Sequence, residues 1–160
     1  MTTLDPIIID QLDGLLTGET NPITALANAS ALLNDSMTDL NWAGFYLFNT
    51  KTGQLDLGPF QGKVACMHIQ LGKGVVGTSY QQQSVIRVAN VHEFAGHIAC
   101  DSASNAEIVI PINVDGKTVA IMDIDSPKFD RFSEEDEKIL TQFGQTLAAH
   151  LDTAALNTVY

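Results

Sequence analysis

The chain has 160 residues, of which 45% are hydrophobic, and its 19 acidic and 8 basic side chains give a formal net charge of −11. This length supports one domain, residues 1–160, with a hydrophobic core of its own. The negative charge argues against nucleic acid and anionic membranes as partners, because binding phosphate groups requires clustered Lys and Arg. The first residues lack the basic and apolar regions of a signal peptide, and no apolar run approaches the roughly 20 residues that span a bilayer. We therefore expect a cytoplasmic protein in a reducing compartment, where structural disulfides are rare.

Apolar spacing and turn residues predict helices towards both ends of the chain and short strands between them. In chain order, the sequence predicts helices over 5–16 and 22–33, strands over 41–49, 54–57 and 65–71, and a glycine-rich turn over 72–77 that leads into a short helix ending near 83. A strand over 85–88, a hairpin of 107–114 with 118–125, and a helix from 134 to 153 or beyond follow. Residues 58–62 are expected to form a loop, and the polar region 89–105 a long functional loop. Mostly local strands between terminal helices indicate an α+β fold, with an antiparallel sheet and helices packed on one face.

The chain has two cysteines, Cys66 and Cys100. Cys100 lies in the polar region with His97 and His92, either of which could lower the pKa of its thiol and so favour the reactive thiolate. Cys66 lies in an expected alternating strand, which fits a buried and unreactive cysteine. In a reducing compartment, we expect any disulfide between them to be transient and catalytic.

A metal site is the alternative use of these side chains. Cys66, His68, His92, His97 and Cys100 could supply ligands, but their spacing matches no standard zinc pattern, so we expect no metal. The sequence has no G-x-S-x-G elbow of a hydrolase, and its glycine-rich turn matches no phosphate-binding pattern. The thiols therefore remain the main candidates for chemistry.

Two carboxylates, Asp123 and Asp125, are separated by one residue in an expected strand, so their side chains face the same side. Either this is the solvated end of the strand, or the acids form a cup for an ammonium group. Glu107 in the partner strand joins them if the connection is a three-residue loop, 114–116, which places it opposite Asp123. A two-residue turn with regular pairing places it opposite Ile124, on the other face. The ammonium-cup hypothesis therefore predicts the three-residue loop.

Two aromatic residues, Trp42 and Tyr46, lie four apart in an expected strand and therefore on one face of it. They could form the wall of a pocket or fill the core, which is the usual place of aromatic side chains with this spacing. In either place, the indole N–H and the phenol O–H need polar partners when buried.

Seven short segments carry a resemblance to a known family. They are N-W-A-G-F-Y (41–46), G-P-F-Q-G-K (58–63), A-C (65–66), G-K-G-V-V-G (72–77), G-H-I-A-C-D (96–101), S-N-A-E-I-V (104–109) and D-I-D-S (123–126). Together they resemble the free methionine-(R)-sulfoxide reductases, a family built on the GAF domain. The resemblance implies a sheet of about six antiparallel strands flanked by helices, and no metal or organic cofactor.

The resemblance also implies a redox cycle for the two cysteines. The Cys100 thiolate would attack the sulfur of free methionine sulfoxide, releasing methionine and leaving a sulfenic acid. Cys66 would resolve this acid by forming a Cys66–Cys100 disulfide, and a thioredoxin-type dithiol would restore both thiols by exchange.

For the remaining candidates, the resemblance implies substrate binding. Glu107, Asp123 and Asp125 would bind the substrate ammonium and polarise the sulfoxide, while Trp42 and Tyr46 would line the methyl-sulfoxide end. An acidic cup of this kind would reject methionine inside a peptide, where the nitrogen is a neutral amide.

One position departs from the family pattern. The family often has a third cysteine in a G-V-C-G segment, where this chain has Val76, so Cys66 is the only internal thiol that can resolve Cys100. The rival hypotheses are a non-catalytic GAF domain that binds a small molecule, and a redox sensor whose disulfide is itself the switch. The apolar faces of the terminal helices could form the seam of a homodimer.

Overall fold

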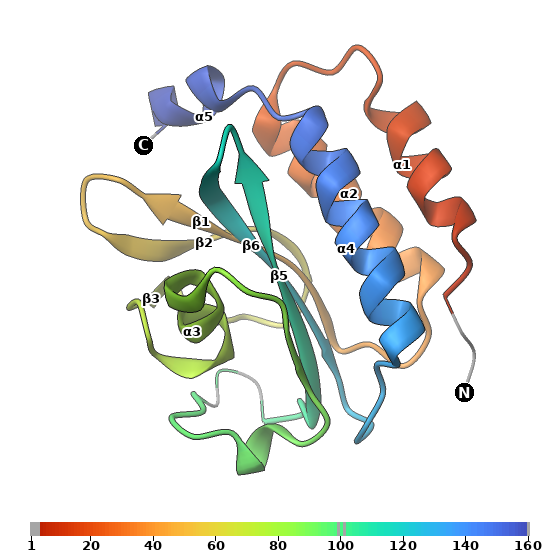
Figure 1. Cartoon of the computed structure of the whole chain (residues 1–160), viewed down its shortest axis with the longest axis vertical. Helices are drawn as coiled ribbons and strands as arrows, with labels where there is room; N and C mark the ends of the chain where they lie inside the picture. The colour runs from red at the N-terminus through yellow and green to blue at the C-terminus, as the bar shows by residue number, and fades with distance from the viewer. Residues whose placement is uncertain (1–3, 99, 101, 160) are drawn as a thin grey trace.

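The computed structural model describes residues 4–98, 100 and 102–159, and within them six antiparallel strands form a sheet in the order β3-β2-β1-β6-β5-β4 (Figure 1). The strands are β1 (Trp42–Asn49), β2 (Gln54–Gly62), β3 (His68–Ile69), β4 (Ile86–Val88), β5 (Ala106–Val114) and β6 (Lys117–Ser126). Each strand pairs with its neighbours in the antiparallel sense. The predicted α+β class, with about six antiparallel strands, is confirmed.

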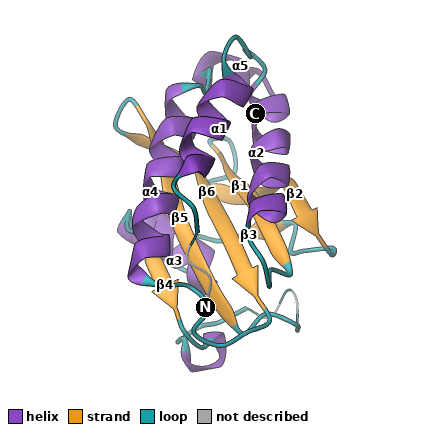
Figure 2. Ribbon diagram, turned by 90° about the vertical axis from the view of Figure 1, so that its right-hand side faces the viewer, coloured by secondary structure: helices purple, strands orange, loops and turns teal. Residues whose placement is uncertain are grey.

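Three long helices cover one face of the sheet (Figure 2). α2 (Pro22–Ser36) lies over β1 and β2, α4 (Glu134–Ala149) lies over β5, and α1 (Ile7–Leu16) packs against both helices. Alternate strand residues such as Phe45 and Met122 point into the layer between helices and sheet and are completely buried there. This apolar layer is the main core, and burial of each large side chain in it contributes about 1.5–3 kcal/mol to stability.

Side-chain caps set the starts of two of these helices. The side chain of Asn21 accepts hydrogen bonds from two backbone N–H groups at the start of α2, at 3.0 and 3.3 Å, and Ser133 begins α4 with a capping box. Both predicted starts are confirmed. The predicted last helix over 134–153 is divided, because α4 ends at Ala149 and α5 (Thr153–Val159) follows as a separate helix.

The predicted loop over 58–62 is wrong, because these residues continue β2. Gly58 and Pro59 together lie opposite one residue of β1, which makes a β-bulge. A bulge accommodates proline, which has no N–H to give to the strand pairing. Beyond it, Gly44 of β1 pairs with Phe60, and a Cβ at position 44 would lie 2.7 Å from the Cα of Phe60. The strands therefore approach closely because position 44 is glycine.

The predicted strand over 65–71 is also wrong in extent. Only His68–Ile69 forms a strand, β3, which pairs with β2. Residues 63–67 instead form the connection between β2 and β3, so Cys66 lies outside any strand. The expectation that Cys66 is an unreactive strand residue therefore loses its basis.

The face of the sheet opposite the long helices has its own cover. α3 (Gly74–Gln82) packs against β5 and β6 on this side (Figure 1). It ends close to the predicted end near 83, but it begins inside the predicted turn over 72–77. Its Val75 and Val76 join a second apolar cluster with Trp42 and Ile121. The polar region 89–105 connects β4 to β5, as predicted, and its described residues, 89–98, 100 and 102–105, contain one 3-10 turn, η1 (Val91–Glu93).

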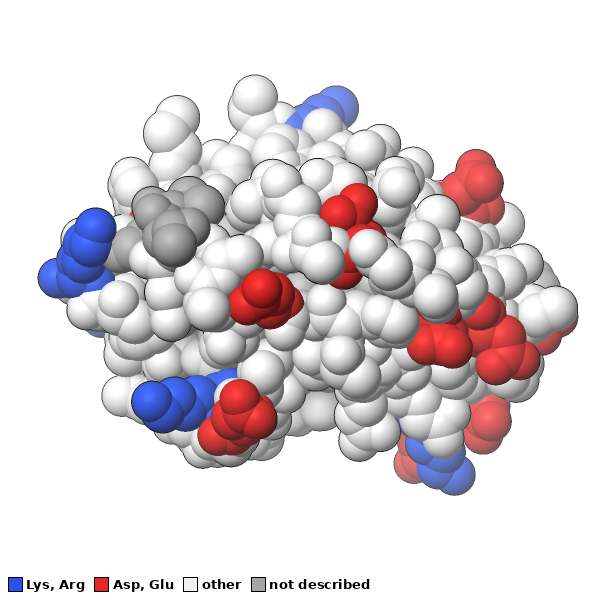
Figure 3. Space-filling model, turned by 90° about the horizontal axis from the view of Figure 1, so that it is seen from above, with Lys and Arg blue, Asp and Glu red and all other residues white. Residues whose placement is uncertain are grey.

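Two observations bear on the predicted partners. On the face seen in Figure 3, acidic side chains are spread across the surface and the basic ones lie mostly towards its edges. This face therefore offers no concentrated positive charge for phosphate groups. In addition, no helix among the described residues combines the length and the apolar character that crossing a bilayer needs.

Candidate active site

The sheet brings the candidate site residues together on the face opposite the long helices. Trp42 of β1 pairs with Asp125 of β6, and Asp125 pairs with Glu107 of β5. Asp123 lies two residues earlier in β6, opposite Gly44 of β1. Because alternate residues of a strand share a face, these side chains all project from the same side of the sheet.

The connection between β5 and β6 differs from the one that the ammonium-cup hypothesis predicted. The three-residue loop 114–116 is wrong, because Val114 pairs with Lys117 across a two-residue turn. Asp115 and Gly116, the two turn residues, both have positive φ, 52° and 76°. This is the type I′ turn that Asp-Gly favours, since its twist matches that of the flanking strands.

A β-bulge just beyond the turn restores the face that the hypothesis required. The register shifts by one residue between Ile112 and Asn113, which leaves Val119 as an extra residue in β6. Glu107 consequently lies opposite Asp125 rather than opposite the residue before it. The three carboxylates therefore share one face, although by a route that the sequence analysis did not consider.

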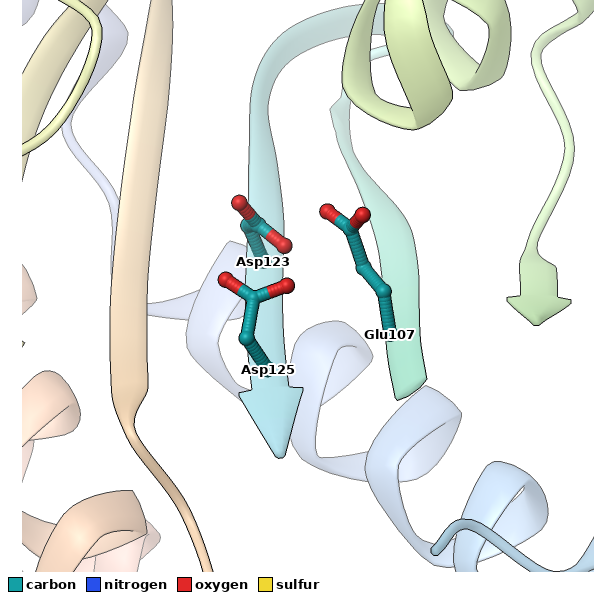
Figure 4. Close-up of side chains that lie close together, drawn as sticks. All are labelled: Glu107, Asp123 and Asp125. Atoms are coloured by element: carbon teal, nitrogen blue, oxygen red, sulfur yellow. The ribbon is translucent and has the colours of Figure 1, made fainter. Parts of the chain in front are cut away.

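The carboxyl groups of Glu107, Asp123 and Asp125 lie side by side on adjacent strands (Figure 4). One oxygen from each forms a group whose members all lie within 4.8 Å of one another, and all three side chains are buried. Within the described part of the chain, no group donates a hydrogen bond to Oδ1 of Asp123. A buried acceptor of this kind is costly unless a donor reaches it, and a bound ammonium group supplies one.

Burial changes the protonation of this group. Burial raises the pKa of Glu107 well above its usual value, and the neighbouring charges of Asp123 and Asp125 raise it further. Burial also raises the pKa of Asp123 from 3.8 to about 6, although hydrogen bonds with Glu107 and Asp125 act in the opposite direction. Both carboxyl groups therefore keep their protons to higher pH than a solvent-exposed carboxyl group does.

Three close carboxylates can bind either an organic cation or a metal ion. Hard cations such as Ca²⁺ and Mg²⁺ prefer oxygen ligands, and this trio is the one group of potential metal ligands found among the described residues. The cysteines and histidines considered for zinc do not form such a group there, since Cys66 and Cys100 are disulfide-bonded and His68 pairs with Asp56. The absence of a metal stays a prediction.

Trp42 and Tyr46 connect the site to the segment that carries Cys66. Their rings are stacked, with centroids 5.8 Å apart. The indole N–H of Trp42 donates a hydrogen bond to the carbonyl of Lys63 at 3.2 Å, and the hydroxyl of Tyr46 donates to the carbonyl of Cys66 at 2.9 Å. Burial raises the pKa of the Tyr46 hydroxyl, and the negative charges of the three carboxylates raise it further. The hydroxyl therefore stays protonated and can donate a hydrogen bond.

Cys66 and Cys100 form a disulfide that joins the connection 63–67 to the long polar segment, with their Cα atoms 5.4 Å apart. The pairing that the resemblance implied is therefore present. Part of the long segment is held against α3, since the N–H of Gly74 donates to the carbonyl of Gly96 at 3.2 Å.

A cavity of about 50 Å³ lies where these parts meet. Its lining includes Cys100, the three carboxylates, Trp42 and Tyr46. Trp42 and Tyr46 thus line the cavity and also belong to the second apolar cluster. The sequence left open whether they form a pocket wall or fill the core, and they do both. Six of the seven candidate residues line one cavity, and the seventh, Cys66, is bonded to Cys100.

The sequence analysis missed several other lining residues. Ser104 accepts a hydrogen bond from Asn41 at 2.9 Å at the edge of the cavity, and Ile69 and Val75 supply apolar wall. Ser104 and Val75 lie inside the resembling segments 104–109 and 72–77, which could have indicated them, whereas Ile69 lies between two such segments and carries no comparable signal. His97 was considered for its effect on Cys100, and it does line the cavity. Burial lowers its pKa and His92 lowers it further, so the imidazole is neutral at physiological pH.

Comparison with known proteins places this geometry in a family. The GAF domain model matches residues 25–152, which is most of the chain. A curated free methionine-R-sulfoxide reductase of Escherichia coli is 49% identical over 148 residues, covering 92% of this chain and 86% of that protein. The chain belongs to the free methionine-(R)-sulfoxide reductase family of GAF domains.

Two further proteins are similar to this chain over most of its length. Protein YtsP of Bacillus subtilis is 54% identical over 141 residues, covering 88% of this chain and 86% of that protein. The structure of fRMsr of Staphylococcus aureus in complex with substrate superposes with a TM-score of 0.88 at 42% identity, covering 95% of this chain and 98% of that one. The family resemblance stated from the sequence is confirmed, and so is the GAF fold.

Proposed function

We propose that this protein reduces free L-methionine (R)-sulfoxide to L-methionine through a cycle of thiol, sulfenic acid and disulfide. The observation that carries the proposal is the single cavity in which Cys100 meets three buried carboxylates. It combines a redox-active sulfur with a site for an ammonium group, and the reduction of a free amino acid sulfoxide needs both. The close relatives named as free methionine-R-sulfoxide reductases support the same reaction and the R epimer.

The carboxylates select the free amino acid. Asp123, whose buried Oδ1 lacks a donor among the described residues, accepts a hydrogen bond from the substrate ammonium together with Asp125. Charge-assisted hydrogen bonds of this kind are worth about 1.5–3 kcal/mol. A peptide amide offers no positive charge and would leave the buried carboxylates uncompensated. Trp42 and Tyr46 line the methyl-sulfoxide end.

Cys100 is the nucleophile of the first step. Its thiolate attacks the sulfoxide sulfur while the proton held on Glu107 goes to the sulfoxide oxygen. The sulfur–oxygen bond of the substrate then breaks and the oxygen passes to Cys100, so methionine leaves and Cys100 becomes a sulfenic acid. The thiol of Cys66 attacks this sulfur, forming the disulfide and releasing water. Two thiols have then given two electrons to one substrate molecule.

A thioredoxin-type dithiol in the cytoplasm completes the cycle by exchange with the disulfide. The cycle needs the one domain of residues 1–160 and neither metal nor organic cofactor. We include a homodimer in the proposal because Ile7 and Leu15 on α1 expose apolar side chains, and molar mass measured by light scattering tests it.

The decisive experiment measures methionine released from free methionine sulfoxide, separated by epimer, with a thioredoxin system and with dithiothreitol. We expect loss of the R epimer alone, and no turnover by Cys100→Ser. The matched variant Cys66→Ser, fully reduced and without reductant, still releases up to one methionine per chain. Binding without turnover of either epimer by the reduced protein would refute the enzyme and leave a sensor, and turnover by Cys100→Ser would refute the nucleophile.

A further inference from the structure

Exposed apolar side chains gather around the disulfide. Of the six large hydrophobic side chains that are exposed in the described part of the chain, three lie within two residues of Cys66 or Cys100. These are Val64, Met67 and Ile98, with exposed fractions of 88%, 71% and 40%. Because the Cα atoms of the two cysteines are 5.4 Å apart, the three side chains border one disulfide, and we call them the apolar rim. Exposed apolar groups that cluster in this way mark interaction sites on soluble domains.

The apolar rim is not the result of a loosely held segment. The connection 63–67 is fixed through its main chain, since Trp42 and Tyr46 donate to the carbonyls of Lys63 and Cys66. The carbonyl of Met67 accepts a further hydrogen bond from the N–H of Leu57 at 2.9 Å. The backbone is therefore held from the cavity side while the side chains of Val64 and Met67 remain in solvent.

The two sulfur-bearing residues have different surroundings. Cys100 lines the cavity, whereas Cys66 is not among its described lining residues and belongs to the connection that carries Val64 and Met67. Both cysteines are partly exposed, so the contrast between them lies in the cavity lining and not in their exposure. A protein cannot enter a cavity of about 50 Å³, so a protein reductant must reach the disulfide from the outside.

We propose that the apolar rim is the docking surface of the dithiol protein that reduces the disulfide, and that this protein attacks Cys66. The inference rests on the proposed function, which requires that the disulfide be reduced in every cycle. A thiolate of the partner bonds to Sγ of Cys66, the disulfide bond breaks, and Cys100 leaves as a thiolate into the cavity. The second thiol of the partner then attacks the first partner sulfur, which is bonded to Cys66 in the mixed disulfide, and Cys66 is released. The partner ends as a disulfide, having given two electrons, and the two protons end on the cysteine thiols.

The charge beside the rim indicates what the partner presents. Lys63 directly precedes Val64, and Lys73 precedes Gly74, where an added Cβ would lie 3.3 Å from the Ile98 side chain. Both lysines are exposed, in a chain whose net charge is −11. A partner with an apolar surface around its dithiol and acidic groups at the margin therefore fits this site. Redox encounters of this kind need only a small interface, which three apolar side chains can anchor.

The test compares a protein reductant with a small one on the oxidised protein. The double variant Val64→Ser/Met67→Ser is mixed with reduced thioredoxin or with dithiothreitol, the reaction is quenched with acid and alkylated, and the alkylated cysteines of this chain are counted from its own intact mass. We expect the second-order rate constant with thioredoxin to fall about tenfold and the one with dithiothreitol to stay unchanged. Ile7→Ser, which removes an apolar side chain with an exposed fraction of 53% on α1, on the other side of the sheet, is the control and should change neither rate constant. An unchanged rate with thioredoxin, or an equal loss with both reductants, overturns the docking surface.

A second measurement identifies the attacked sulfur. A thioredoxin that keeps only its attacking cysteine stops at the mixed disulfide, and peptide mapping should find it on Cys66. A mixed disulfide on Cys100 overturns this part of the proposal. Methionine release by the reduced protein without any reductant separates the two hypotheses. A protein that releases none fails the proposed function itself, whereas normal release with unchanged thioredoxin rates fails the docking surface alone.

Discussion

The two faces of β6 show how one strand serves two purposes. Met122 and Ile124 point towards the long helices and are completely buried among apolar side chains. Asp123 and Asp125 alternate with them, point into the cavity, and are almost as well buried. Burial alone therefore does not distinguish core from site. What differs is whether the buried group is satisfied, since the apolar face gains from exclusion of water while buried carboxylates oppose folding until a cation reaches them.

The largest expected effect separates the two faces by neighbouring substitutions. Asp123→Asn removes the charge that we propose as the acceptor of the substrate ammonium, so KM for free methionine sulfoxide should rise about 10–100-fold in steady-state kinetics. The free energy of unfolding should not fall, because a buried charge is lost along with the contact.

Met122→Ala is the matched change on the helix side. It leaves a cavity in the core and should lower the free energy of unfolding by about 2–5 kcal/mol in denaturant titration, with KM changed by less than about twofold. If Met122→Ala raised KM as much as Asp123→Asn, the division of labour between the two faces would be wrong.

The pH dependence of stability tests whether burial of the carboxylates on the cavity face of β6 opposes folding. The pKa of Asp123 rises from 3.8 to about 6 on folding, so the folded state holds this proton more tightly than the unfolded state. Its contribution to stability is complete below pH 3.8 and is lost as the pH rises to about 6, and Glu107 acts in the same direction. The unfolding free energy of Asp123→Asn relative to the unchanged protein should therefore increase between about pH 4 and pH 6. A constant difference would show that burial does not perturb this carboxyl group.

A smaller effect is expected from the hydrogen bond that holds Cys66. Tyr46→Phe removes the 2.9 Å contact with the Cys66 carbonyl, at a cost of about 1 kcal/mol. Disulfide formation should slow by about fivefold relative to methionine release in stopped single-turnover reactions, because the resolving thiol is less well placed. Tyr80→Phe, which alters a tyrosine stacked on Phe48 away from the carboxylates, serves as the control. Equal slowing of both steps by Tyr46→Phe would assign the residue to substrate binding alone.

The smallest effect concerns the position where the family often has a third cysteine. Val76 is buried and lines the cavity, and cysteine is close to it in size. Val76→Cys should leave kcat within about twofold and the unfolding free energy within about 1.5 kcal/mol, because two thiols complete the cycle. A tenfold rise in kcat with thioredoxin would show that a third thiol has a part in recycling.

The helix starts and the β5–β6 turn could be predicted because they depend on the types of a few neighbouring residues. Asn21 and Ser133 are strong N-caps, and both helices begin where these residues placed them. Asp115 and Gly116 likewise form the turn that their types favour. The errors arose where pairing between strands overrides local preference. Gly58 and Pro59 are turn residues by type, but a bulge accommodates them within β2.

The candidate site depended on one feature that the sequence does not show. Val119 has nothing in its type to mark it as a bulge, yet the extra residue decides which face Glu107 occupies. Residue types and spacing supplied the candidate residues, the resemblance to a family supplied their roles, and the pairing of β5 with β6 explains how the carboxylates meet. Cys66 was misplaced because an alternating pattern over 65–71 looks like a strand, whereas only two of these residues pair.

The segment 63–66 is anchored through its carbonyl oxygens, and this has a consequence for how such a protein can diverge. Ala65 lines the cavity, but Trp42 and Tyr46 contact the main chain, which is the same whatever side chains occupy positions 63 and 64. Substitutions at positions 63 and 64 can therefore accumulate while the thiol of Cys66 stays in place. The solvent-facing side chains of this segment can therefore change during evolution to match changes in a partner protein, while the cavity behind the segment keeps its shape.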